Sequence, residues 1–172
     1  MGSFLRGKDL SWFDDNQILK DVAKIAEEKL KPLANKIDQE GFYPSVVMSE
    51  LGEAGAYCGH LEKYGARYDL AIDAMAEISR QCGSTGFMSW CHDVCGLYME
   101  QSGNNALIAR LDNHVRGITL GGTGLSNPMK ALTGIEKMAL KAEKVDGGYM
   151  VNGCLPWVSH IVKGGYCGVI AG

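Results

Sequence analysis

The sequence predicts an α+β protein: an N-terminal all-α helical bundle followed by the start of an antiparallel, β-barrel-like domain. Two observations lead to this prediction. Up to about residue 115, apolar residues recur at three- and four-residue steps between capping residues. After Gly117, glycines become frequent and residues 137–145 alternate loosely with period two. We therefore expect an all-α domain over residues 1–117 and part of a β-domain over residues 118–172.

The first predicted helix begins at Asp14 or Asp15. A carboxylate there accepts orphan N–H bonds and favours the positive end of the helix. Pro32 is expected to kink the helix because it lacks the N–H that the preceding turn needs. The residues behind the cap form one apolar stripe: Ile18, Val22, Ile25, Ala26, Leu30, Leu33 and Ile37.

Two further helices are predicted before the middle of the chain. A short one begins near Pro44 and stops between Gly52 and Gly55. The next is capped by Asp69 and is nearly apolar all round, which is typical of a helix at the centre of a bundle. Gly83 is expected to end it in a left-handed conformation.

The helical domain closes with two more segments. The run from Thr85 to Gln101 is rich in apolar residues and ends before Gly103. Asn104 or Asn105 then caps a last short helix that extends to Leu111.

The β-region is predicted from short extended runs. Residues 118–120 form a strand candidate, and the glycine-rich residues 121–128 form an irregular stretch. Residues 137–145 and 149–153 pair as a hairpin around the Asp146-Gly147 turn, and residues 157–159 and 166–171 add two strands. Only 55 residues follow Gly117. These are too few to bury both faces of a sheet, so we expect a fragment of a longer protein.

Composition excludes several functions. A net charge of −3 argues against nucleic acid as the main partner, and no apolar run approaches the roughly 20 residues of a membrane span. The first ten residues do not form a secretory signal. We therefore expect a cytoplasmic protein with six reduced cysteines. Cys91, His92 and Cys95 lie in an apolar helical pattern without a second ligand pair, so no metal site is expected.

Few residues point to chemistry by themselves. The stretch from Gly121 to Ser126 is either a plain strand-to-loop turn or a set of N–H and hydroxyl groups for a polar ring or phosphate. Trp157 and Ser159 would share one face of a strand, where an aromatic plane beside a hydroxyl donor suits a flat heterocycle. A core tryptophan beside a chance serine is the simpler interpretation. The four histidines suggest no triad, and His114 is expected to be solvated.

The order of these features changes the interpretation. Residues 51–55, 77–85 and 102–104 precede Ser126-Asn127-Pro128, the Tyr-Met-Val-Asn-Gly run of residues 149–153, and Trp157-Val158-Ser159-His160. Along nearly its whole length the chain resembles the acyl-CoA dehydrogenase family, from the N-terminal helical domain to the opening of the middle β-domain. In that family the corresponding elements are a Thr-Glu-Pro loop, a Tyr-(hydrophobic)₂-Asn-Gly strand and a Trp-Ile-Thr-Asn strand.

The resemblance implies non-covalent FAD. By position, Leu125 and Ser126 would contact the pyrimidine side of the flavin, with Thr123 nearby. Trp157 would pack against the isoalloxazine, and Ser159 would approach the N5 edge. With a one-residue insertion in the alignment, Thr133 corresponds to the family serine that lies near the flavin pyrophosphate. The helix from Thr85 to Gln101 resembles the wall of the acyl pocket, with Ser89 and Trp90 as substrate-binding candidates beside Phe87 and His92.

The resemblance also implies α,β-dehydrogenation of an acyl-CoA thioester in fatty acid metabolism. A glutamate removes the α-proton while a hydride passes to flavin N5. That glutamate belongs to the family's C-terminal helical domain, beyond Gly172, so no catalytic residue is assigned. Electron-transfer flavoprotein or oxygen would accept the electrons, and the expected assembly is a homotetramer.

The sequence departs from the family where residues 126–133 replace Thr-Glu-Pro-Gly-Ala-Gly-Ser-Asp and where Leu155-Pro156 precedes Trp157. These departures bear on the acyl-CoA substrate more than on FAD. Two alternatives stay open: a flavin-dependent monooxygenase on the same fold, and a non-catalytic helical interaction module.

Overall fold

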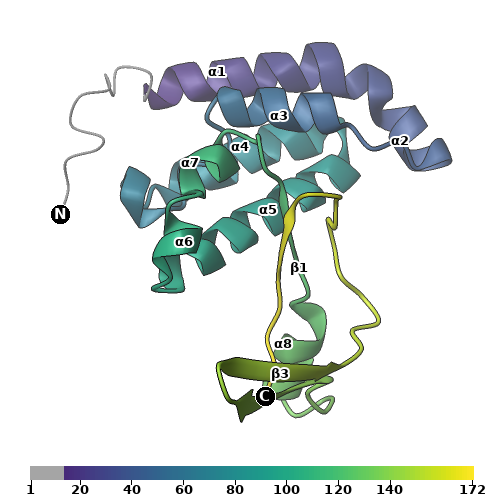
Figure 1. The fold of residues 1–172 in the computed structure, drawn as a ribbon. Helices are drawn as coiled ribbons and strands as arrows, with labels where there is room; N and C mark the ends of the chain where they lie inside the picture. Colours follow the sequence, from purple (N-terminus) through teal and green to yellow (C-terminus); the bar gives the residue numbers. More distant parts are fainter. Residues whose placement is uncertain (1–13) are drawn as a thin grey trace.

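The computed structural model describes residues 14–172 and begins with a long, interrupted helix (Figure 1). Helix α1 (Asp15–Ile25) is capped by Asp14, whose carboxylate accepts the N–H of Asn16 at 3.0 Å. It passes through the π-turn η2 (Ala26–Leu30) and the 3₁₀-turn η3 (Lys31–Leu33) into α2 (Ala34–Glu40). The interruption at Pro32 is therefore the one that the sequence predicts.

Helices α3 (Ser45–Glu53) and α4 (Tyr68–Gln81) pack beside α1, and the short turn η4 (Glu62–Tyr64) lies in the loop between them. The expectation that α4 is apolar all round and central is wrong. Ile72 is 65% exposed, because α4 buries only one stripe against α1 and α5 and leaves its other side to solvent. The buried residues of that stripe are Leu70, Ala71, Ala74 and Ile78.

Helix α5 (Gly83–Gln101) is the longest and follows α4 directly. Gly83 is its first residue and has no positive φ, contrary to the prediction. The extended backbone of Cys82, with φ −155° and ψ 108°, already turns the chain between the helices.

Two short helices, α6 (Asn105–Ile108) and α7 (Leu111–Val115), complete the helical part. The side chain of Asn104 accepts the N–H of Ala106 at 2.9 Å and caps α6, as expected. In residues 14–172, no helix is both long enough and apolar enough to cross a bilayer.

Two apolar clusters hold the helices together. The larger one joins α1, α3 and α4 and includes Val22, Met48, Leu51, Tyr57 and Ile78, none more than 1% exposed. The smaller one gathers Cys58, Leu61, Cys95, Met99, Leu111 and Val115 between α5 and α7. Burial of this apolar area is the main stabilising contribution to the bundle.

The β-region contains two pairs of strands. Strand β2 (Leu140–Val145) pairs antiparallel with β3 (Gly148–Gly153) through a turn at Gly147, where φ is +79°. Strand β1 (Gly121–Thr123) begins after the predicted residues 118–120 and pairs in parallel with β4 (Tyr166–Gly168). A parallel pair needs a long crossover, which the chain between the two strands provides. The described strands do not close a barrel.

Two further predictions for the β-region are wrong. Ser126–Leu132 forms a helix, α8, where an irregular stretch is expected, and Pro128 is tolerated because it lies in the first turn. The predicted strand at 157–159 shrinks to one bridge between Ser159 and Thr123. Pro156, which precedes this segment, has no N–H to donate to a ladder, and His160 follows the segment with a φ of +58° that ends the extended backbone. In Figure 1, β1 leads from the bundle down to α8 and the hairpin.

Candidate functional site

Two of the predicted flavin residues, Thr123 and Ser159, lie opposite each other on neighbouring segments. The N–H of each donates to the carbonyl of the other at 3.1 Å, so the two residues form a hydrogen-bonded antiparallel pair. The Thr123 hydroxyl lies 3.3 Å from the Tyr98 hydroxyl of α5. Burial raises the pKa of the Cys91 thiol to about 11, and a hydrogen bond from the Ser159 side chain partly opposes this shift. Both hydroxyls therefore face α5.

Trp157, Leu125 and Ser126 are accessible. The Trp157 side chain is 71% exposed, Leu125 is half-buried immediately before α8, and Ser126 is the exposed first residue of that helix. The exposed indole offers an apolar plane, and the exposed Ser126 offers a hydroxyl. This combination suits a flat heterocycle with polar edges.

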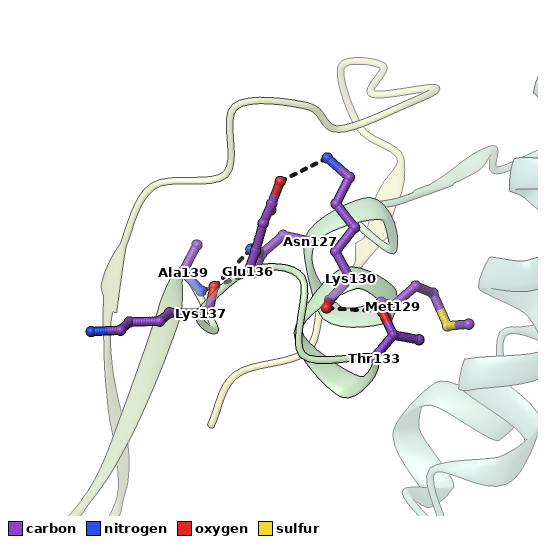
Figure 2. Close-up of polar contacts among 7 residues, drawn as sticks. All are labelled: Asn127, Met129, Lys130, Thr133, Glu136, Lys137 and Ala139. Atoms are coloured by element: carbon purple, nitrogen blue, oxygen red, sulfur yellow. Dashed lines mark hydrogen bonds and ion pairs between the residues drawn. The ribbon is translucent and has the colours of Figure 1, made fainter.

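Thr133 lies at the far end of α8. Figure 2 shows its hydroxyl turned back onto the helix, where it donates to the carbonyls of Met129 and Lys130 at 3.1 and 3.0 Å. The side chain is exposed, and its oxygen keeps acceptor capacity. Thr133 is thus separated by the length of α8 from Leu125 and Ser126.

Asn127, which was not among the predicted site residues, fixes α8 in place. Its amide donates to the Lys137 carbonyl at 3.0 Å and to Glu136 at 3.2 Å, and its oxygen accepts the Ala139 N–H at 2.8 Å (Figure 2). Lys130 forms an ion pair with Glu136 at 2.8 Å beside it. Residues 126–132, which depart from the family motif, therefore form a helix that is hydrogen-bonded to the residues just before β2.

The substrate-binding candidates on α5 lie on different sides of the helix. Ser89 and His92 are buried, and the Ser89 hydroxyl donates to the Thr85 carbonyl at 3.0 Å. Trp90 is 37% exposed and stacks on Phe87 with ring centroids 5.7 Å apart. Phe87 and Trp90 thus form the accessible aromatic pair, while Ser89 and His92 belong to the core.

A shallow apolar groove of about 330 Å³ runs past the start of α5. Phe87 and Met88 form one wall, and the segment from Gly41 to Tyr43 forms the other. Trp90 does not line this groove. Of the stacked pair Phe87 and Trp90, only Phe87 therefore contributes to the groove.

The expectation that His114 is solvated is wrong, because all four histidines of the chain are buried. His114 stacks on His92, and these two rings are the centre of a buried histidine cluster; burial lowers the pKa of His114 to about 4. The cluster also includes His160, whose ring lies 6.2 Å from that of His92. The sequence hint of this buried histidine cluster was that His92 stands within an apolar helical run.

His60 and Asp93 form a second buried pair at the edge of the same cluster. His60 Nδ1 lies 3.7 Å from Asp93 Oδ1, which is too long for a hydrogen bond. Burial lowers the pKa of His60 and raises that of Asp93 well above its ordinary value. Both shifts favour the uncharged pair over the ion pair. No group of three or more potential ligands in residues 14–172 could hold a metal ion.

Comparison with known proteins identifies the fold. Residues 14–112 match the N-terminal domain of acyl-CoA dehydrogenases. The chain belongs to the acyl-CoA dehydrogenase family. It is 32% identical over 162 residues to a protein of Arabidopsis thaliana named mitochondrial isovaleryl-CoA dehydrogenase, covering 86% of this chain and 38% of that protein. Benzylmalonyl-CoA dehydrogenase of Aromatoleum aromaticum is 25% identical over 158 residues, covering 88% of this chain and 42% of that protein.

Solved structures share this fold. Butyryl-CoA dehydrogenase of Megasphaera elsdenii superposes with a TM-score of 0.68 at 27% identity, over 84% of this chain and 40% of that one. A structure titled as the electron transferring flavoprotein of Acidaminococcus fermentans gives a TM-score of 0.69 at 23% identity, over 88% and 41%. The latter likeness concerns the fold alone. The chain spans about 38% of the length of the first curated relatives that it matches.

Proposed function

We propose that this chain forms the helical domain and part of the flavin-binding wall of an FAD-dependent acyl-CoA dehydrogenase. The observation that carries the proposal is the pairing of Thr123 with Ser159 against α5, in a chain that belongs to this family. We call Thr123, Leu125, Ser126, Trp157 and Ser159 the flavin wall. FAD, when bound, supplies the hydride acceptor for oxidation of a C–C bond next to a thioester carbonyl.

The donor set of the flavin wall fits a flavin. Trp157 offers an exposed indole face for stacking, and Ser126 offers an accessible hydroxyl at the start of α8. Thr123 and Ser159 are joined by two backbone hydrogen bonds, and Thr123 is only 4% exposed with its hydroxyl beside that of Tyr98, so we propose that this pair sets the backbone of the wall. Thr133 is the position that we propose for a pyrophosphate contact. We place the base that removes the α-proton outside these 172 residues.

For the substrate, we propose a short or compact acyl-CoA. Trp90 is large enough to shorten an acyl pocket bounded by α5, and Ser89 lies on the buried side of the same turn. Several curated relatives are named isovaleryl-CoA dehydrogenases, and isovalerate is a short branched acid. Electron-transfer flavoprotein or oxygen as acceptor, a homotetramer and a cytoplasmic location complete the proposal.

The test is to purify the protein with the whole of its encoded chain and to add acyl-CoA thioesters of different length without oxygen. The proposal predicts a yellow protein whose oxidised flavin band is bleached by short or branched acyl-CoA. A colourless protein would support the non-catalytic helical module instead. A yellow protein that no acyl-CoA bleaches, but that consumes oxygen once its flavin is reduced, would support the monooxygenase.

A further inference from the structure

Two buried histidines from different parts of the chain hold the peptide groups of Gly121. The Gly121 N–H donates to His92 Nδ1 at 3.0 Å, and the Gly121 carbonyl accepts from His160 Nδ1 at 2.8 Å. A side chain could not fit at this position, since a Cβ atom would lie 2.5 Å from Cys95 Sγ. The start of β1 is therefore fixed against α5 by contacts on both sides of one glycine.

The hydrogen-bond partners determine where each imidazole carries its proton. A peptide N–H can only donate, so His92 Nδ1 is unprotonated and Nε2 donates to the His114 carbonyl at 2.9 Å. A carbonyl can only accept, so His160 carries its proton on Nδ1. Burial lowers the pKa of His160, and in the neutral ring Nε2 then accepts the hydroxyl of Tyr43 at 2.6 Å. The two rings are neutral and hold opposite tautomers.

His160 also occupies a strained backbone conformation. Its φ of +58° is uncommon for a residue with a side chain, and such residues persist only where surrounding contacts hold them. The contacts here are the Gly121 carbonyl and the Tyr43 hydroxyl, and the side chain is 9% exposed. The left-handed turn ends the bridge immediately after Ser159.

These contacts lie next to both members of the Thr123–Ser159 pair. Gly121 precedes Thr123 by two residues on β1, and His160 follows Ser159 directly. Tyr43 belongs to the segment between α2 and α3, so the helical domain contributes to the position of both hydroxyls. Burial lowers the pKa of His92 and of His160, which keeps both rings in the neutral form that these bonds require.

We propose that His92, His160 and Tyr43 are positioning residues of the flavin wall, because they fix the backbone on both sides of the Thr123–Ser159 pair. The inference rests on the proposed function only in its last step, from the position of the two hydroxyls to flavin binding. The proton positions can be tested without any flavin.

The first test is nuclear magnetic resonance of the imidazole nitrogens in the ¹⁵N-histidine-labelled chain near neutral pH. The proposal predicts that His160 is the neutral Nδ1–H tautomer, which is the minor form of free imidazole side chains, and that His92 is the Nε2–H tautomer. The spectrum of His160→Asn lacks the two imidazole nitrogen signals of His160 and so assigns them. A His160 signal from the Nε2–H tautomer, or from a charged ring, would overturn the proposal.

The second test compares Tyr43→Phe with Tyr68→Phe, a control at an exposed tyrosine of α4. Loss of one hydrogen bond should speed hydrogen exchange of the Thr123 and Ser159 amides by roughly 2- to 10-fold. The control should leave exchange unchanged. His160→Asn should speed exchange of these amides less than His160→Gly does. Both residues tolerate the left-handed backbone, but only asparagine can still donate a hydrogen bond to the Gly121 carbonyl. Equal exchange in Tyr43→Phe and the control would overturn the proposal.

Flavin titration of the same variants, in the protein with its whole encoded chain, separates the two claims. The positioning role predicts that Tyr43→Phe weakens FAD binding by roughly 2- to 10-fold, with Tyr68→Phe unchanged. Wild-type affinity in Tyr43→Phe would overturn the positioning role. A wild-type protein that binds no FAD would contradict the proposed function, whereas the proton positions would stand as measured.

Discussion

The imidazole rings of His92 and His114 stack with centroids 3.8 Å apart, and each donates from Nε2 to the backbone carbonyl of the other residue. The reciprocal bonds join α5 to α7 through two polar side chains that are fully buried. Two positive charges at this distance would repel each other strongly in a poorly solvated site. The stacked pair therefore cannot carry two charges, and because burial lowers the pKa of both rings, both are neutral.

This requirement predicts that acid destabilises the fold. An unfolded histidine binds a proton below a pH of about 6.5, whereas the folded pKa of His114 is about 4. The contribution of His114 to stability should thus be constant above the first value and fall as the pH decreases through this window. The loss from His114 alone is about 2–3 kcal/mol between about pH 7.5 and pH 4.5.

Urea unfolding at the two pH values measures this loss, with His114→Gln as the matched variant. Glutamine retains an amide donor for the His92 carbonyl but does not titrate. Its free energy of unfolding should depend less steeply on pH. The same pH dependence in both proteins would contradict the assignment of the effect to His114.

Replacement of Asn127 tests the attachment of α8. Asn127→Ala leaves the Ala139 N–H and the Lys137 carbonyl without their partner, and the Asn127 side chain is 7% exposed. A buried group left unpaired costs roughly 1–3 kcal/mol. We expect a loss of this size in urea unfolding and faster amide exchange at Ala139.

Asn152→Ala, at an exposed asparagine of β3, is the control and should change stability by less than about 0.5 kcal/mol. Equal stabilities of the two variants would show that the hydrogen bonds of Asn127 do not hold α8.

Trp90 tests the substrate proposal. Trp90→Ala removes a half-exposed ring that stacks on Phe87, so the acyl pocket should accept longer chains. The measurement is the rate of flavin reduction by acyl-CoA of increasing length, with Tyr68→Ala as the exposed aromatic control. A loss of stability without any change in the chain-length profile would assign Trp90 to packing alone.

The sequence carries clear local signals for much of the helical part. Asp14 and Asn104 cap helices where the expected side-chain acceptors stand, and Pro32 interrupts the first helix. The hairpin around Gly147 is equally local, because its turn residues and period-two pattern lie within a few positions. These elements were predictable from neighbouring residues.

Other features depend on contacts between distant parts of the chain. The parallel pairing of β1 with β4 and the bridge at Ser159 join segments that no local pattern connects. The burial of His114 depends on α5, whereas its place beside Arg116 near the predicted domain junction suggested a solvated position. Helix α8 was missed for another reason: the glycine-rich composition of residues 121–128 favoured an irregular stretch, although Pro128 is compatible with the first turn of a helix.

Trp157 offers the most direct test of the flavin wall. Its side chain is 71% exposed, so Trp157→Ala should leave the free energy of unfolding nearly unchanged. If the indole stacks on the isoalloxazine, truncation removes about 2–4 kcal/mol of binding. Ser159→Ala removes only a hydroxyl worth roughly 0.5–1.5 kcal/mol, and should keep its colour but be reduced more slowly. Tyr149→Ala, at an exposed aromatic residue of β3, is the control.

The decisive measurement is the dissociation constant of FAD for the protein with its whole encoded chain, with and without the Trp157→Ala substitution. Stacking of Trp157 on the isoalloxazine predicts binding that is roughly 30- to 1,000-fold weaker in the variant, while Tyr149→Ala binds like the wild type. Unchanged FAD affinity in a stably folded Trp157→Ala protein would contradict the assignment of these residues to a flavin wall.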